Sequence, residues 1–186
     1  MGKLFYVIGA SGSGKDTLMN YARNSMRLSG KVIFAHRYIT RPAFSGNENH
    51  VALSKKEFES RLTANLFALH WESHDNYYGI GIEINCWMEM GLNVVMNGSR
   101  EYLPMARDKY PELIAISIEA SPSVISARLA ARGREDGLEI RNRMERNEKL
   151  KIDFNNVVKI QNDGAVEDAG EILVKIISSG ISDIKA

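Results

Sequence analysis

The stretch Gly9-Ala10-Ser11-Gly12-Ser13-Gly14-Lys15 decides the fold of this chain. Glycines at these spacings allow successive backbone N–H groups to turn inward around a phosphate, and a following helix N-terminus and a lysine add positive charge. The apolar run from Leu4 to Ile8 precedes the stretch, and Leu18, Ala22 and Met26 recur at helical spacing after it. A buried strand, a glycine-rich loop and an amphipathic helix in this order predict a P-loop, which binds the phosphates of a nucleotide such as ATP.

The residues after the lysine depart from the usual P-loop pattern. Most P-loops carry Ser or Thr directly after Gly-Lys, and its hydroxyl binds Mg²⁺. Here Asp16 comes first and Thr17 second. We therefore expect Asp16 or Thr17 to meet the metal, with an alternative role for Asp16 as an anion that stabilises the first helical turn.

The bulk properties are those of one ordinary globular domain. The chain has 186 residues and a formal charge of +1, so no bulk field attracts nucleic acid or an acidic membrane. The single cysteine, Cys86, excludes an internal disulfide and a cysteine-built metal site; its apolar neighbours predict inert packing. No apolar run approaches the roughly 20 residues of a membrane span, and the sequence enters its first strand without a signal peptide. We expect a cytoplasmic protein.

Beyond the P-loop, predicted strands alternate with predicted helices. Ser54-Lys55-Lys56-Glu57 is a capping box ahead of one of these helices. This alternation, with short connections, predicts an α/β fold with a parallel sheet and helices on both faces. We expect strands over 3–8, 31–35, 92–96, 113–119 and 157–160, and helices over 16–28, 82–90, 101–110 and 122–132, with a final helix carrying Ile172, Leu173, Ile176 and Ile177.

Several short segments behind the P-loop resemble the guanylate kinase family in content and order. They are Thr40-Arg41, Asn76-Tyr77-Tyr78-Gly79, Arg128 to Gly133, Ile140 to Arg143, and Asn162-Asp163. The resemblance covers nearly the whole chain. It implies a single P-loop kinase domain, with a core over 1–35, 92–131 and 155–186, an acceptor segment over 36–91, and a lid over 132–150.

The resemblance also implies roles for individual residues. Lys15 would span the donor phosphates, and Arg41, joined here by Arg37, would hold the acceptor phosphate. Arg132 and Arg143 would be catalytic arginines of the lid, although an ion pair between Arg143 and Glu139 is the alternative. Asn162 and Asp163 would lie beside the donor adenine. For Arg128 and Arg146 we favour an ion-paired surface helix.

The departures from the guanylate kinase pattern concern the acceptor. A guanine pocket needs carboxylates that accept hydrogen bonds from the ring N1–H and the exocyclic amine. The base-reading glutamate of the family falls on Leu69, the hydroxyl residue on Ile80, and the Asp-x-Asp pattern on Asn97-Gly98-Ser99, followed by Arg100. The second clamp arginine falls on Phe44 and the clamp tyrosine on His50. GMP is therefore a poor candidate acceptor.

Five segments of this altered pattern resemble the ribose 1,5-bisphosphate phosphokinase family of bacterial phosphonate breakdown. The resemblance implies phosphoryl transfer from ATP, with Mg²⁺, to a small sugar phosphate, giving 5-phosphoribosyl 1-diphosphate (PRPP). Rival interpretations are a nucleoside monophosphate kinase and a non-catalytic binding module. The segments are Gly-Ser-Gly-Lys-Asp, His-Arg-Tyr-Ile-Thr-Arg, Glu-Asn-His-Val-Ala-Leu-Ser, Tyr-Tyr-Gly and Asn-Gly-Ser-Arg, and the expected substrate-binding residues are Arg37, Arg41, His50, Tyr78 and Arg100.

Overall fold

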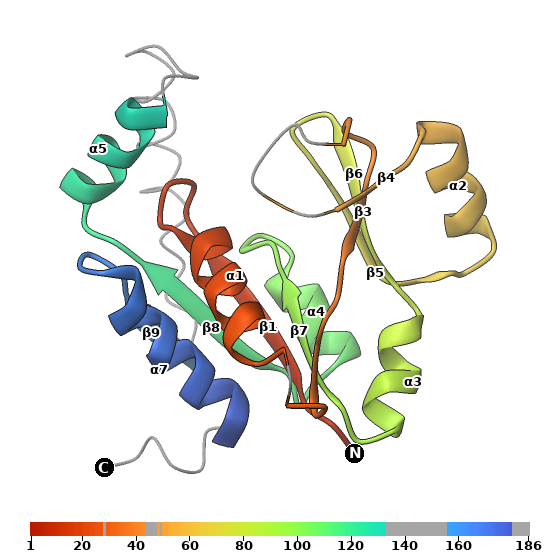
Figure 1. Ribbon diagram of the computed structural model, residues 1–186. Coiled ribbons are helices and arrows are strands. Elements are labelled where there is room, and N and C mark those ends of the chain that lie inside the picture. The colour runs from red at the N-terminus through yellow and green to blue at the C-terminus, as the bar shows by residue number, and fades with distance from the viewer. Residues whose placement is uncertain (28, 44–47, 49, 133–155, 180–186) are drawn as a thin grey trace.

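The core of the protein is a five-stranded parallel sheet with the strand order β2-β7-β1-β8-β9. The structure is a computed structural model that describes residues 1–27, 29–43, 48, 50–132 and 156–179. The strand carrying the P-loop lies at the centre of the sheet (Figure 1). The strands are β1 (Leu4–Gly9), β2 (Val32–Phe34), β7 (Asn93–Asn97), β8 (Ile114–Glu119) and β9 (Val157–Gln161).

Helices cover both faces of this sheet, as the alternation of elements predicts. On one face α1 (Lys15–Ser25) and α7 (Val166–Ser179) pack against Phe5 and Val7 of β1. On the other face α3 (Glu83–Glu89) and α4 (Leu103–Lys109) pack with Tyr6 and Ile8. Successive β1 side chains alternate between the faces and both faces are buried, which explains the unbroken apolar run. The α/β fold class is confirmed.

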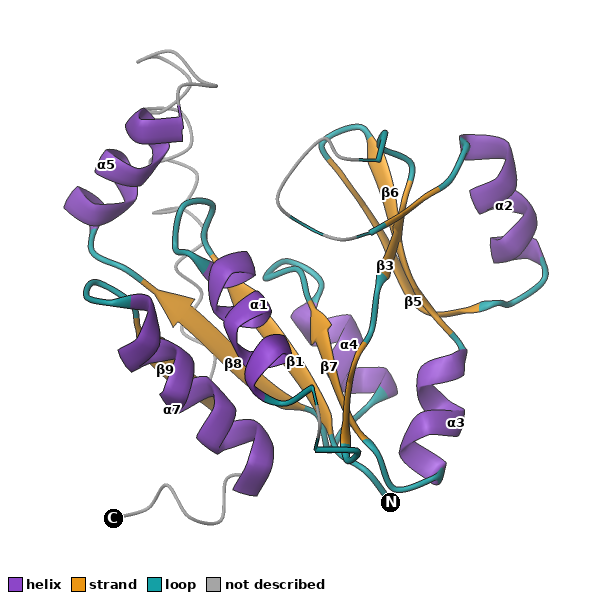
Figure 2. Ribbon diagram, viewed as in Figure 1, coloured by secondary structure: helices purple, strands orange, loops and turns teal. Residues whose placement is uncertain are grey.

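The acceptor segment (residues 36–91) builds a second sheet, which the sequence analysis missed. This four-stranded sheet has the order β4-β3-β6-β5 and lies to one side of the core sheet (Figure 2). Its strands are β3 (Arg37–Ile39), β4 (Val51–Ala52), β5 (Phe67–Ser73) and β6 (Asn76–Gly81), with α2 (Lys55–Thr63) between β4 and β5.

The turn between β5 and β6 explains why this hairpin is hard to read from the sequence. Ser73 pairs with Asn76, and the two residues between them, His74 and Asp75, have φ of 50° and 58°. Such a two-residue hairpin turn usually carries Asn-Gly or Asp-Gly, because glycine adopts positive φ without strain. His-Asp is a rarer solution. By contrast, the capping box is confirmed on its N-cap side: the Ser54 hydroxyl accepts a hydrogen bond from the Glu57 N–H at 3.1 Å.

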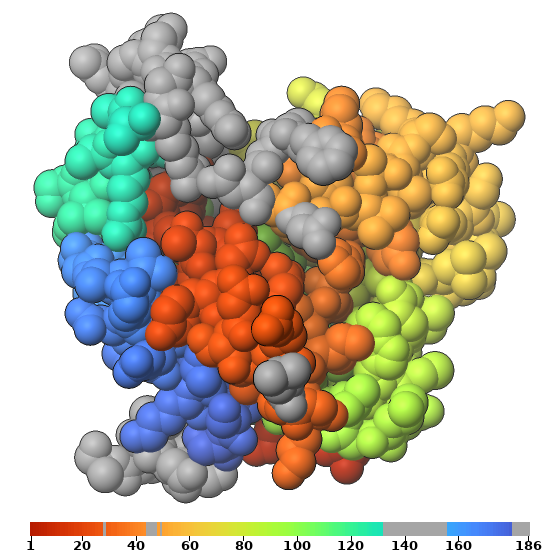
Figure 3. Space-filling model, viewed as in Figure 1, coloured from red at the N-terminus to blue at the C-terminus, as the bar shows by residue number. Residues whose placement is uncertain are grey.

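Two features outside the site complete the description of the fold. Cys86 is exposed on α3, so the prediction that it packs among apolar neighbours is wrong. Within the described ranges, no helix combines the length and the apolar character needed to cross a bilayer. In the space-filling view, the acceptor segment and the helices α5 (Pro122–Arg132) and α7 form opposite sides of the molecule, with α1 between them (Figure 3).

Candidate active site

A cavity of about 500 Å³ lies between the core sheet and the acceptor segment. It opens at the carboxyl ends of the adjacent parallel strands β1 and β7, where ligands of open α/β sheets bind. Three parts of the chain line it. They are the P-loop with the start of α1 (Gly9, Ala10, Ser11, Gly12, Gly14, Lys15 and Asp16), the acceptor segment (Arg37, Arg41, Trp71, Ser73, His74, Asn76 and Tyr78) and the end of β7 with the loop that follows it (Asn97, Gly98, Ser99, Arg100 and Glu101).

The P-loop is braced from behind by two side chains that meet at one carbonyl. The Ser13 carbonyl accepts hydrogen bonds from Asn162 Nδ2 at 2.7 Å and from Arg128 Nη1 at 3.2 Å. Gly14 has φ of 87°, and a Cβ there would lie 2.3 Å from Asn162 Nδ2, so only glycine fits. For Arg128 the sequence favours an ion-paired surface role; the structure adds a contact with the Ser13 carbonyl across 115 residues, which local spacing cannot show.

Asp163, next to Asn162, fixes the start of α5. Its Oδ1 accepts a hydrogen bond from the Ser121 N–H at 2.7 Å, and Oδ2 accepts one from Gln161 Nε2 at 2.6 Å. These hydrogen bonds hold the pKa of Asp163 below its ordinary value. The pair Asn162-Asp163 thus joins the P-loop to α5, and its expected place beside the adenine stays a prediction.

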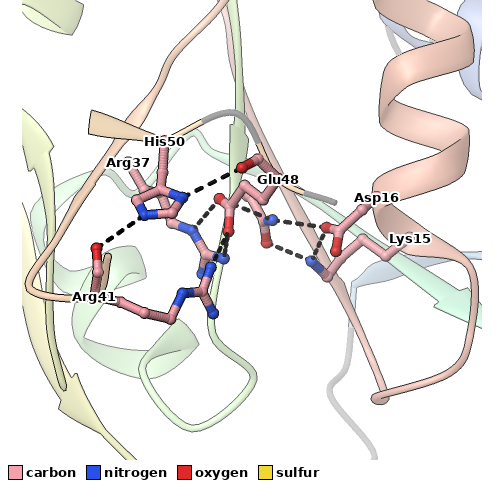
Figure 4. A network of polar contacts seen from close by, with 7 residues as sticks. Lys15, Asp16, Arg37, Arg41, Glu48 and His50 are labelled. Atoms are coloured by element: carbon pink, nitrogen blue, oxygen red, sulfur yellow. Dashed lines mark hydrogen bonds and ion pairs between the residues drawn. The ribbon is translucent and has the colours of Figure 1, made fainter. Parts of the chain in front are cut away.

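Lys15 points into a cluster of polar groups rather than into solvent (Figure 4). Its Nζ donates to Asn97 Oδ1 at 2.5 Å and to Asp16 Oδ1 at 3.0 Å. Burial lowers the pKa of Lys15 from its ordinary value, and the Asp16 carboxylate opposes part of that shift. The ammonium group is therefore already desolvated and directed before any nucleotide phosphate binds.

Asp16 is better placed than Thr17 to meet a metal ion. Asp16 lines the cavity, whereas Thr17 is exposed and lies outside the lining. Burial alone would raise the pKa of Asp16, but the Lys15 ammonium, the Arg37 charge and the hydrogen bond from Asn97 together outweigh it and hold that pKa below its ordinary value. The hydrogen bonds from Lys15 and Asn97 both engage Oδ1, and the side chain is 40% exposed. An ionised, accessible carboxylate suits Mg²⁺, which is commonly held by one or two carboxylates together with substrate phosphates and water.

Two arginines form the opposite wall of the cavity. The guanidinium of Arg37 lies over the Tyr78 ring, 5.1 Å from its centroid, and donates to the Glu48 carboxylate through Nε and Nη2. Arg41 Nη2 lies 3.8 Å from Glu48 Oε2. Sequence reasoning predicted both arginines and Tyr78 but missed Glu48, whose only signal was its place in the motif Glu-Asn-His-Val-Ala-Leu-Ser.

His50 does not line the cavity, contrary to its expected contact with substrate. The side chain is buried, with Nδ1 3.2 Å from the Glu48 carbonyl and Nε2 3.2 Å from the Arg41 carbonyl. The ring therefore ties two backbone segments together. Of the four histidines, His74 is the one that lines the cavity, because the β5–β6 turn carries it there.

Apolar side chains occupy the two positions that correspond to the guanine-binding groups of guanylate kinases. Leu69 is 1% exposed and Ile80 0% exposed, and both belong to the core cluster that includes Tyr6 and Met96. Beside them the rings of Trp71 and Tyr78 stack at 5.6 Å with an interplanar angle of 4°. No hydrogen-bonding side chain stands at either position, so neither can pair with a purine edge.

Comparisons with known proteins agree with this geometry. The family model described as guanylate kinase matches residues 1–180. A protein of Thiobacillus denitrificans named ribose 1,5-bisphosphate phosphokinase PhnN is 52% identical over 185 residues, covering 100% of this chain and 97% of its own. A protein of the same name from Desulfomicrobium baculatum is 50% identical, covering 95% of each chain. The chain belongs to the PhnN branch of the guanylate kinase family.

Solved structures support the fold of this PhnN-family chain. Guanylate kinase from Anaplasma phagocytophilum superposes with a TM-score of 0.65 at 16% identity, covering 96% of this chain and 85% of its own. A sugar kinase from a Janibacter species superposes with a TM-score of 0.54 at 15% identity, covering 97% and 96%. At such low identity these likenesses concern the fold alone.

The lid arginines expected in a PhnN-family kinase fall mostly outside the described part of the chain. Arg132 is the last residue of α5, but its side chain is not described, and Arg143 lies within the undescribed residues 133–155. Their catalytic roles stay predictions. Arg100, by contrast, lines the cavity from the loop after β7.

We predict that Asn162→Ala destabilises the protein even without nucleotide. The substitution removes one of the two donors to the buried Ser13 carbonyl while Arg128 keeps the other, and one such hydrogen bond contributes about 0.5–1.5 kcal/mol. Urea denaturation of the unliganded protein measures it, with the exposed Asn20→Ala on α1 as the control, expected within about 0.5 kcal/mol of the unchanged protein. If Asn162 served only to contact adenine, the unliganded variant would be as stable as the control.

Proposed function

We propose that this protein transfers the γ-phosphoryl group of ATP to the 1-phosphate of ribose 1,5-bisphosphate, giving PRPP and ADP. The observation that supports this best is the make-up of one cavity. A P-loop lines one wall, Arg37, Arg41 and Arg100 line the other sides, and the base-reading positions Leu69 and Ile80 are apolar. The name carried by the relatives points to the same substrate.

The reaction needs positioning more than acid–base chemistry. An oxygen of the 1-phosphate attacks the γ-phosphorus of ATP, and the bond from that phosphorus to the β–γ bridging oxygen breaks, leaving ADP. The second pKa of a phosphate monoester is about 6, so the attacking group is already mostly dianionic at neutral pH. No general base is required. The barrier lies in bringing two polyanions in line, which fixed cations lower.

The cations of the cavity divide this work between the two substrates. Lys15 holds the donor phosphates, and Arg37 and Arg41 hold the phosphate that attacks. Asp16 is the residue that would hold Mg²⁺, which when bound neutralises charge on the donor phosphates. We assign Arg132 and Arg143 to charge on the transferring group, as the family resemblance implies, and we place the enzyme in the cytoplasm, where it would supply PRPP during phosphonate breakdown.

Two other functions fit the fold less well. A nucleoside monophosphate kinase of the guanylate type would need polar groups at Leu69 and Ile80, which are buried among apolar side chains. A non-catalytic binding module would not need an intact P-loop that binds nucleotide phosphates. Here the glycine pattern is complete, and Lys15 is directed into the cavity together with Asp16.

Turnover of ATP with alternative acceptors tests the proposed function. With Mg²⁺ present, we expect ribose 1,5-bisphosphate to yield a diphosphate at C1 by ³¹P NMR, with kcat/KM at least about 100-fold above that for GMP. Lys15→Ala is the control for a contaminating kinase. A higher kcat/KM for GMP would favour the nucleotide kinase, and no transfer to any acceptor would favour the binding module.

We predict that Arg100→Ala selectively impairs recognition of the second phosphate of the substrate. Arg100 lines the cavity from the loop after β7, whereas Arg37 and Arg41 line it from the acceptor segment. A charge-assisted hydrogen bond contributes about 1.5–3 kcal/mol, so KM for ribose 1,5-bisphosphate should rise roughly 10- to 100-fold. KM for ribose 1-phosphate, which lacks the 5-phosphate, should barely change. The exposed Arg27→Ala is the control, and an equal rise for both sugars would contradict this role.

A further inference from the structure

Glu48 is a largely buried carboxylate that contacts Arg37 and Arg41, the two arginines of the cavity wall opposite the P-loop; we call this wall the acceptor wall. Its side chain is 12% exposed, and it contacts three residues that line the cavity: Arg37, Arg41 and Asn97. Glu48 itself does not line the cavity. Its carboxylate lies between the guanidiniums of Arg37 and Arg41 on one side and the Lys15–Asp16 pair of the P-loop on the other (Figure 4).

The contacts of Glu48 determine how Arg37 is presented. Arg37 donates to both carboxylate oxygens along one edge of its guanidinium, through Nε to Oε1 at 2.5 Å and through Nη2 to Oε2. The Tyr78 ring holds one face of the same guanidinium. With one edge bound by the carboxylate and one face covered by the ring, Nη1 and the second N–H of Nη2 are left as the donors for a phosphate oxygen in the cavity.

Glu48 also makes it possible for two arginines to share this wall. Arg41 lies close enough to pair with the carboxylate oxygen Oε2 that accepts from Arg37. Two guanidiniums held this close repel each other unless an anion lies between them. Arg41 also lines the cavity, so a ligand there can reach this side chain.

Two neighbours hold Glu48 itself in place. Asn97 Nδ2 donates to Glu48 Oε1 at 3.4 Å and to Asp16 Oδ1 at 3.0 Å, so the carboxylate is connected to the P-loop through one amide. On the other side, the His50 ring contacts the backbone carbonyls of Glu48 and Arg41. This explains why a motif containing both Glu48 and His50 belongs to the acceptor wall although neither residue lines the cavity.

We propose that Glu48 is a positioning residue that pre-organises Arg37 and Arg41 for the attacking phosphate, an inference that rests on the proposed function. Orienting the clamp before binding lowers the entropic cost of binding the sugar bisphosphate. The opposite role would be a carboxylate that competes with the substrate phosphate for the arginines. The two roles predict opposite changes in KM for the sugar bisphosphate when the charge on Glu48 is removed.

Steady-state kinetics of Glu48→Gln and Glu48→Asp test this role. The glutamine keeps the size of the side chain but accepts through one oxygen only, so we expect KM for ribose 1,5-bisphosphate to rise at least about tenfold, with KM for ATP within twofold. The aspartate keeps the two acceptor oxygens on a shorter stem, and its KM should fall between those of Glu48→Gln and the unchanged enzyme. Glu72→Gln, an exposed carboxylate on β5, is the matched control and should change neither KM.

The outcomes separate this inference from the proposed function. If the unchanged enzyme does not phosphorylate ribose 1,5-bisphosphate, the proposed function fails before any variant is compared. If it does, an unchanged KM in Glu48→Gln overturns the positioning role, and a lowered KM shows that the carboxylate competes with substrate. Equal rises in both KM values would indicate general disruption and also overturn it. Should Glu48→Gln not fold, the KM of Glu48→Asp decides, and a value equal to that of the unchanged enzyme contradicts the inference.

Discussion

Positive charges must be held close together in this protein before either polyanionic substrate binds. Lys15, Arg37 and Arg41 all line one cavity, and each is paired with a carboxylate, Asp16 or Glu48. Asn97 donates to both carboxylates and accepts from Lys15, so one buried amide joins the two halves of the cluster. The site depends on this compensation, because unpaired charges at such burial would be costly to desolvate.

The fold supplies the geometry that this cluster needs. The apolar strand β1 is buried on both faces and delivers the P-loop to the carboxyl edge of the core sheet, while the adjacent β7 ends at Asn97. The acceptor sheet brings Arg37 on β3 beside Tyr78 on β6, two strands that pair antiparallel. Two sheets that share one apolar cluster thus hold the donor and acceptor groups on opposite walls of one cavity.

The sequence predicted those features that depend on local pattern. Glycine spacing identified the P-loop, and apolar runs identified the parallel strands, each within one or two residues of its observed ends. The β5–β6 hairpin was not predicted because its turn is His74-Asp75 rather than a pair containing glycine. Arg128 was missed because its partner, the Ser13 carbonyl, lies 115 residues away along the chain. Glu48 was missed because no regular spacing marks its contacts with Arg37 and Asn97. His50 was expected in the cavity because the resemblance gave its position without its contacts.

The central claim is that the acceptor pocket captures phosphate instead of a nucleobase. A crystal structure with ribose 1,5-bisphosphate and a non-hydrolysable ATP analogue tests it most directly. The account predicts the 1-phosphate between the P-loop and the two arginines, Arg37 and Arg41, with the sugar near Trp71 and Tyr78. A 1-phosphate bound away from both arginines, or a sugar bisphosphate confined to the ATP site, would contradict it.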